Sequence, residues 1–161
     1  MKTAVQIEVL RELLQQLDDG VNADAGGIRA FPAEAYTSPE IARREWEVMF
    51  KARPQLVGMT SDLPSPGSFL TTEDFSFPVL VTRDDQGVVR AFLNACRHRG
   101  SMVETAPKGQ KSRFSCPFHA WTYDAKGALI GVPMEQQFGA IDRSCLGLIE
   151  LPALERYGFL V

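Results

Sequence analysis

Both histidines and two of the three cysteines of this chain lie in two short stretches, CRHRG and CPFHAWTYD. Together the stretches form the pattern C-x-H-x17-C-x2-H, made by Cys96, His98, Cys116 and His119. A single buried histidine or cysteine is usually an ordinary core residue. Two stretches that each pair a thiol with an imidazole instead predict a metal site.

The donor set limits which metal the site would take. Tetrahedral zinc accepts two cysteines and two histidines, but zinc fingers usually place both cysteines before both histidines. A cluster held by four thiolates needs more cysteines than the three in the chain. A [2Fe–2S] cluster fits the alternating order, with Cys96 and Cys116 on the inner iron and His98 and His119 on the outer iron. A structural zinc module remains the alternative.

Short β-type runs surround both stretches. They are rich in Val, Leu, Phe and Thr and comprise QLVGMTS (55–61), FPVLVTR (77–83), VVRAFLN (88–94), CLGLIEL (145–151) and YGFLV (157–161). Asp84–Gly87 and Asp124–Gly127 are turn sequences that would close hairpins. The runs do not alternate with helices, so the pattern predicts a mainly β domain.

The first third of the chain has a helical pattern instead. Residues 4–18 carry apolar side chains at helical spacing, and residues 20–37 have the composition of a loop. Ser38-Pro39-Glu40 predicts the start of a second helix, with Ser38 as N-cap, and Pro54 would end it. We therefore expect a helical N-terminal extension over residues 1–53 and a β domain over residues 54–161.

Composition excludes several classes of partner. The chain has 161 residues, a net charge of −3 and 45% apolar residues, which is ordinary for a globular domain and gives no sign of nucleic-acid binding. It has no apolar run long enough to span a membrane, and its acidic, amphipathic N-terminus is unlike a secretory signal. We expect a cytoplasmic protein.

CRHRG followed by CPFHAWTYDAKGAL closely resembles the Rieske motif of ring-hydroxylating oxygenases, in their large (alpha) subunit. SPEIARREWEVMF, QLVGMTSDLPSPGSF and the late strands are similar to the N-terminal Rieske domain of that subunit. The resemblance covers most of the chain from about residue 36. It implies an antiparallel β-sandwich with a small cluster-binding subdomain, whose loops are residues 96–100 and 116–121.

Departures from other Rieske branches support the oxygenase branch. The Rieske proteins of the respiratory cytochrome bc complex have one more cysteine in each cluster loop, and these two cysteines form a disulfide. Ser101 and Phe118 stand at those positions here, so the disulfide cannot form. Soluble Rieske ferredoxins lack a long helical extension, whereas 95 residues precede Cys96 in this chain. A stand-alone Rieske-type ferredoxin remains the alternative function.

Further residues near the ligands have expected roles. Gly100 allows a tight turn and Pro117 stiffens the second loop. Arg99, with Arg97, would offset cluster charge or face a partner, or form a solvated basic pair. Trp121 and Tyr123 would shield the cluster or belong to the core. Cys145 is expected to be a buried filler.

The resemblance also implies the role of the whole protein. Electrons from NAD(P)H would pass through a reductase or ferredoxin to the cluster, and then to a mononuclear Fe(II) in the catalytic domain of a neighbouring alpha subunit. That assembly would commonly be a trimer, sometimes with a beta subunit, and would hydroxylate an aromatic compound with O2. Because the chain has no third histidine and stops at Val161 within an apolar run, we expect the catalytic domain to lie outside it and no catalytic residue within it.

Overall fold

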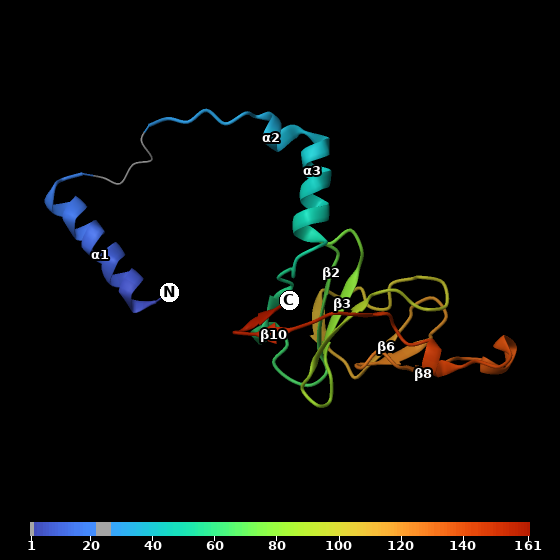
Figure 1. Cartoon of the computed structure of the whole chain (residues 1–161). Helices are drawn as coiled ribbons and strands as arrows, with labels where there is room; N and C mark the ends of the chain where they lie inside the picture. Colours follow the sequence, from blue (N-terminus) through green and yellow to red (C-terminus); the bar gives the residue numbers. More distant parts are fainter. Residues whose placement is uncertain (1, 22–26) are drawn as a thin grey trace. The chain divides into compact units, whose positions relative to one another are not determined.

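A computed structural model describes residues 2–21 and 27–161. The chain divides into two compact units, Met1–Arg44 and Glu45–Val161 (Figure 1). The expected division at residues 53 and 54 stays a prediction. The helical segments that precede β1 are α1 (Thr3–Asp18), α2 (Glu34–Thr37), α3 (Pro39–Glu45) and a π-helical turn at Trp46–Phe50.

The N-terminal prediction of helices is confirmed in its main points. α1 matches the predicted helix at residues 4–18, and its apolar side chains are exposed. The Ser38 hydroxyl accepts a hydrogen bond from the backbone N–H of Ile41 at 3.4 Å, as expected of an N-cap. The prediction of a loop over residues 20–37 is wrong at its C-terminal end, where α2 forms. Residues 22–26 of this range lie outside the described part of the chain.

The second unit is built from three antiparallel sheets, as the mainly β prediction requires. The strands are β1 (Gly58–Met59), β2 (Ser68–Thr72), β3 (Val79–Arg83), β4 (Val89–Leu93), β5 (Lys108–Gln110), β6 (Arg113–Ser115), β7 (Thr122–Asp124), β8 (Leu129–Gly131), β9 (Glu150–Leu151), β10 (Glu155–Arg156) and β11 (Phe159–Leu160). The sheet orders are β5-β2-β3-β4-β9, β6-β7-β8 and β1-β11-β10.

Both predicted hairpin turns are present. The Gly87 N–H donates to the Asp84 carbonyl at 3.0 Å between β3 and β4, and the Gly127 N–H donates to the Asp124 carbonyl at 3.0 Å between β7 and β8. Gly127 has φ +78°, and a Cβ there would lie 2.5 Å from the Phe92 ring. Glycine is required at this turn for both reasons.

Three predicted strands are much shorter than expected, and a turn takes up part of each run. In QLVGMTS only β1 forms, since Asp62 accepts a hydrogen bond from the Met59 N–H at 2.8 Å and starts a 3₁₀ turn at Thr60–Asp62. In CLGLIEL only β9 forms, and the first residue of the run, Cys145, belongs to the 3₁₀ turn Arg143–Cys145, which Asp142 caps by accepting from the Ser144 N–H at 3.0 Å. In YGFLV only β11 forms, because Tyr157 and Gly158 have left-handed backbone with φ +54° and +85°.

The five-stranded sheet separates two hydrophobic cores. Phe69, Leu80 and Phe92 point to one face and share a core with Cys96, Cys116, Phe114, Trp121 and Tyr123. Their strand neighbours Leu70, Val81 and Ala91 point to the other face, in a second core with Leu63, Val79 and Leu160. The alternation of side chains along a strand thus assigns one sheet face to the two cysteines.

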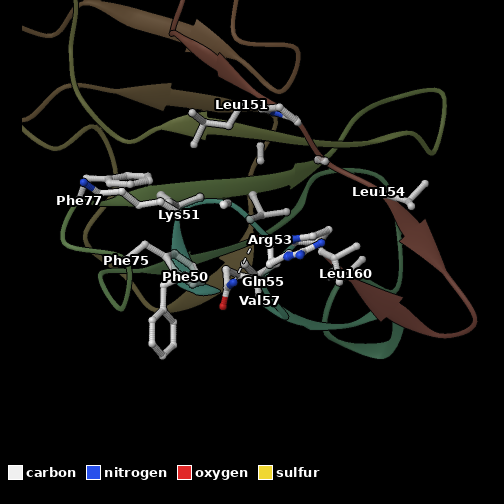
Figure 2. A pocket seen from close by; sticks show the side chains of 18 of the residues that line it. Phe50, Lys51, Arg53, Gln55, Val57, Phe75, Phe77, Leu151, Leu154 and Leu160 are labelled. Carbon is white, nitrogen blue, oxygen red and sulfur yellow. Dashed lines mark hydrogen bonds between the residues drawn. The ribbon is translucent and has the colours of Figure 1, made fainter. Parts of the chain in front are cut away.

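The other sheet face carries an apolar groove with a volume of about 510 Å³ (Figure 2). Phe50, Phe75, Phe77, Leu151 and Leu154 line it, and Lys51 and Arg53 also contribute to its wall. Since Val79 and Val81 line this groove while Leu80 faces the cysteines, the groove and the cysteines lie on opposite sides of the sheet.

Candidate metal centre

The two loops that carry Cys96 and Cys116 are closed by the same pair of hydrogen bonds. The Cys96 carbonyl accepts from the Gly100 N–H at 2.8 Å, and the Cys96 N–H donates to the Ser101 carbonyl at 2.8 Å. The Cys116 carbonyl accepts from the Ala120 N–H at 2.9 Å, and the Cys116 N–H donates to the Trp121 carbonyl at 2.8 Å. The first loop follows β4 and the second lies between β6 and β7.

Each loop has a residue with left-handed backbone four positions after its cysteine. Gly100 has φ +75° and Ala120 has φ +55°. This conformation is free for glycine and costs a residue with a Cβ roughly 1–2 kcal/mol. Two unrelated sequences therefore fold into one backbone shape that presents a cysteine and a histidine.

The two cysteines are buried and the two histidines lie nearer the solvent. Cys96 and Cys116 are each 3% exposed, whereas His98 is half-buried and His119 is exposed. The imidazole ring centroids of His98 and His119 are 4.7 Å apart at an interplanar angle of 65°. The loops thus bring the two histidines together at the surface end of the site, above a buried end that holds the thiols.

Tyr123, a buried residue of β7, holds the first loop against the core. Its hydroxyl lies 3.4 Å from Sγ of Cys96 and accepts a hydrogen bond from the backbone N–H of Arg97 at 3.0 Å. Because that N–H occupies the oxygen as acceptor, the O–H is free to donate to the sulfur. Burial, and then the hydrogen bond to Cys96, raise the pKa of Tyr123, so it stays a donor at neutral pH.

The surroundings of His98 favour its neutral imidazole, which is the form that binds metals. Desolvation lowers the pKa of His98, and electrostatic repulsion from the basic side chains beside it lowers that pKa further. The indole of Trp121 stacks on His98, with ring centroids 5.2 Å apart at 11°.

These residues fit the iron–sulfur group that their types suggest. In residues 2–21 and 27–161 no three His, Cys, Asp or Glu side chains lie close enough together to bind one metal ion. A Rieske [2Fe–2S] cluster does not need such a group, because each of its irons binds only two side chains. Within the same residues, the buried Nε1–H of Trp121 has no hydrogen-bond acceptor. An acceptor such as a cluster sulfide would satisfy this donor.

Of the other residues predicted near the ligands, those on the two loops are exposed and Trp121 is buried. Arg97, Arg99, Gly100 and Pro117 are exposed on the loops, while Trp121 is 4% exposed and belongs to the core that surrounds the thiols. The prediction for Cys145 is wrong. Its side chain is exposed, because Asp142 caps the surface turn that carries it and accepts from its thiol at 3.3 Å.

Two residues of the site escaped prediction. Asn94 is 1% exposed, and its Oδ1 accepts from the N–H groups of Val103 and Glu104 at 3.0 and 3.1 Å while its Nδ2 donates to the Glu104 carbonyl at 2.7 Å. Asn94 thereby ties together the two ends of the segment 94–104, which contains the first loop.

The ring of Phe138 contacts both His98 and Trp121. An asparagine two residues before Cys96 was a usable signal, but nothing in the sequence pointed to Phe138.

No helix in the described part of the chain is long and apolar enough to cross a membrane.

Comparisons with known proteins agree with this geometry. The chain is 36% identical over 136 residues to the glycine betaine monooxygenase oxygenase subunit of Chromohalobacter salexigens, covering 83% of this chain and 30% of that protein. It is 38% identical over 124 residues to the large oxygenase component of a naphthalene 1,2-dioxygenase system of Pseudomonas aeruginosa, covering 75% and 28%. The chain thus spans less than a third of the length of these relatives.

A solved structure has the same fold. The structure of a quaternary ammonium Rieske monooxygenase, described with carnitine oxidation by gut microbiota and inter-subunit electron transfer, matches with a TM-score of 0.73 and 29% identity, over 81% of this chain and 36% of that one. The family model of the Rieske [2Fe-2S] domain matches residues 53–153, which include both loops. The chain belongs to the Rieske [2Fe-2S] domain family.

Proposed function

We propose that Cys96, His98, Cys116 and His119 hold the Rieske cluster and that the domain passes single electrons within an oxygenase alpha subunit. The observation that supports this assignment is the pair of equivalent loop closures, which present two buried thiols and two adjacent imidazoles. When bound, the cluster accepts and donates one electron at a potential above that of all-cysteine ferredoxins, because neutral imidazoles replace two thiolates.

The protein's own groups have distinct tasks in this proposal. The fold keeps Cys96 and Cys116 away from water, and the Tyr123 hydroxyl donates to one thiolate. His119 is exposed at the surface, and in this proposal it serves as the exit for the electron. Arg97 and Arg99 flank His98 on the exposed loop, where they offset negative charge or face the partner.

The ligand assignment can be tested with two cysteine variants of the purified chain. Cys116→Ser should lose the iron, the acid-labile sulfide and the EPR signal of the reduced cluster, while Cys145→Ser, a matched change at an exposed turn, should keep all three. Full iron and sulfide in Cys116→Ser would refute the assignment. His119→Cys tests the zinc alternative, since a Rieske cluster should change colour and fall in potential whereas a structural zinc site should tolerate the swap.

The role of the whole protein belongs to the same proposal. Its relatives are oxygenase components, which favours an oxygenase subunit over a stand-alone ferredoxin. We propose a cytoplasmic enzyme with the helical extension ending near residue 53. A reductase or ferredoxin would supply the electrons, and a mononuclear Fe(II) in a catalytic domain of a neighbouring alpha subunit, in a trimer with or without a beta subunit, would receive them.

The substrate that we propose is an aromatic compound, as for the naphthalene dioxygenase relative. A quaternary ammonium compound is the second candidate, because the glycine betaine monooxygenase subunit is 36% identical over 136 residues. Assays of the complete oxygenase with its reductase should separate the two. Naphthalene-dependent O2 uptake with formation of a diol supports the first, and O2 uptake that depends on glycine betaine supports the second.

A further inference from the structure

The imidazole of His98 lies within a group of aromatic rings drawn from separate parts of the chain. The Trp121 indole stacks almost parallel to it, with centroids 5.2 Å apart at 11°. The Phe138 ring meets it at 5.5 Å and 86°, and also meets Trp121 at 5.7 Å and 75°. Each of the three rings therefore contacts the other two. We call these residues, His98, Trp121 and Phe138, the aromatic triangle.

The two candidate histidine ligands are unequal in this respect. His98 is half-buried within the aromatic triangle. His119 is exposed, and its contact with Phe118, at 4.0 Å between centroids, is to a side chain that is itself 58% exposed. The protein thus covers one of the two imidazoles and leaves the other open to solvent.

Phe138 is held in place by a short turn with its own ion pair. It ends the 3₁₀ helix Glu135–Phe138, and Gly139, with φ +74°, follows it. The guanidinium of Arg143 donates to both carboxylate oxygens of Glu135, through Nε at 3.2 Å and through Nη2. Nη1 of Arg143 also donates to the carbonyl of Ile130 in β8 at 3.1 Å. Figure 1 shows the segment that carries this turn in orange-red after β8. The hydrogen bonds of Arg143 therefore anchor the turn to β8.

We propose that Phe138 is a positioning residue for His98, and that it sets the reduction potential of the cluster by holding the imidazole against Trp121 and keeping water from that side. The inference rests on the proposed cluster ligands. A reduced cluster carries one more negative charge than an oxidised cluster, and a dry surrounding disfavours the more charged state. The cover should therefore lower the potential, and its removal should raise it.

Three variants test this inference on the purified, cluster-loaded chain. Phe138→Ala removes the cover, Phe138→Leu keeps part of its apolar volume, and Glu135→Gln weakens the ion pair without touching a ring. The midpoint potential should shift upward most in Phe138→Ala and less in the other two. Loss of the fixed ring orientation should also change the EPR line shape of the reduced cluster, while iron content stays at the parent's level.

Phe77→Ala is a matched control. Phe77 is 42% exposed, like Phe138, but lines the groove on the opposite side of the sheet. An unchanged potential in Phe77→Ala together with a shift in the Phe138 variants supports the inference.

Parent-like potentials and EPR spectra in the Phe138 variants with full iron content would overturn it, as would an equal shift in Phe77→Ala. If Phe138→Ala loses its iron, Phe138→Leu and Glu135→Gln decide by the same readouts. A parent chain that binds no cluster refutes the proposed function itself.

Discussion

The Tyr123 hydroxyl and the Cys96 sulfur are 3.4 Å apart, joined across 27 positions of sequence inside a fully buried part of the domain. The backbone N–H of Arg97 holds the same hydroxyl at 3.0 Å. One side chain of β7 therefore fixes both a candidate ligand and the loop that carries it.

Tyr123→Phe should lower the reduction potential of the loaded domain. The hydrogen bond to the thiolate strengthens as the cluster becomes more negative, so its loss disfavours reduction. A difference of about 1 kcal/mol between the two redox states corresponds to roughly 40 mV for a one-electron couple. Redox titration measures the shift. Tyr157→Phe, which removes the hydroxyl of a residue that is 82% exposed, should leave the potential unchanged.

Gly100→Ala and Gly127→Ala should differ in their effect on stability although both glycines have a left-handed backbone. Their φ values are +75° and +78°, so each variant loses about 1 kcal/mol from backbone strain. At Gly100 the added Cβ would have no heavy atom within 4 Å from any described residue beyond its chain neighbours, whereas at Gly127 the Phe92 ring lies 2.5 Å away. The clash should add about 1–3 kcal/mol.

Urea unfolding of the two glycine variants gives the comparison. Equal losses would contradict the argument from the Phe92 contact. Ala120→Gly supplies the reverse change in the second loop, where φ is +55°. That variant should be as stable as the parent or more stable, because the strain it relieves offsets the greater freedom of glycine in the unfolded chain.

Asn94→Ala should lower the free energy of unfolding by about 3 kcal/mol. It leaves two N–H groups and one carbonyl of Val103 and Glu104 without their partner in a buried site. Gln55→Ala is the control, because that side-chain amide also bonds to the backbone, donating to the carbonyls of Met49 and Arg53, but near the surface. A loss above about 0.5 kcal/mol in the control would indicate that burial is not the deciding factor.

Asp84 should make the domain sensitive to acid. Burial raises the pKa of its carboxyl, but hydrogen bonds from Val88, Arg90 and Gln86 outweigh this effect, so the folded pKa lies below the usual value. A lowered folded pKa stabilises the protein above the unfolded pKa of about 3.9, and this contribution is lost as pH falls through the folded value.

Asp84→Asn removes the buried one of the two charge partners of Arg90, whose Nε lies 2.9 Å from the Asp84 carboxylate, while Glu150 keeps its contact at 3.1 Å. The variant should be about 2 kcal/mol less stable than the parent at pH 7. Unfolding curves measured from pH 7 downward should show this difference shrinking below about pH 4. A constant difference would refute the pKa argument. Asp85→Asn changes an exposed neighbour that pairs with Lys126 and should have little effect at any pH.

The amino-acid sequence by itself determined the features that depend on neighbours a few positions apart. The spacing of Cys96, His98, Cys116 and His119 was sufficient for the cluster hypothesis and for the family, which the match over residues 53–153 confirms. The hairpin turns and the cap at Ser38 were also predictable. Such features rest on local hydrogen bonds and backbone preferences, which a few residues specify.

Only the tertiary structure decided which distant residues surround the ligands. Phe138 reaches His98 across 40 positions because the chain after β8 turns back to the cluster loops. Tyr123 of β7 reaches Cys96, which follows β4, because strands of two different sheets share one core. The exposure of Cys145 likewise depends on Asp142 and the path of a surface turn. These contacts depend on sheet order and packing, which no local pattern encodes.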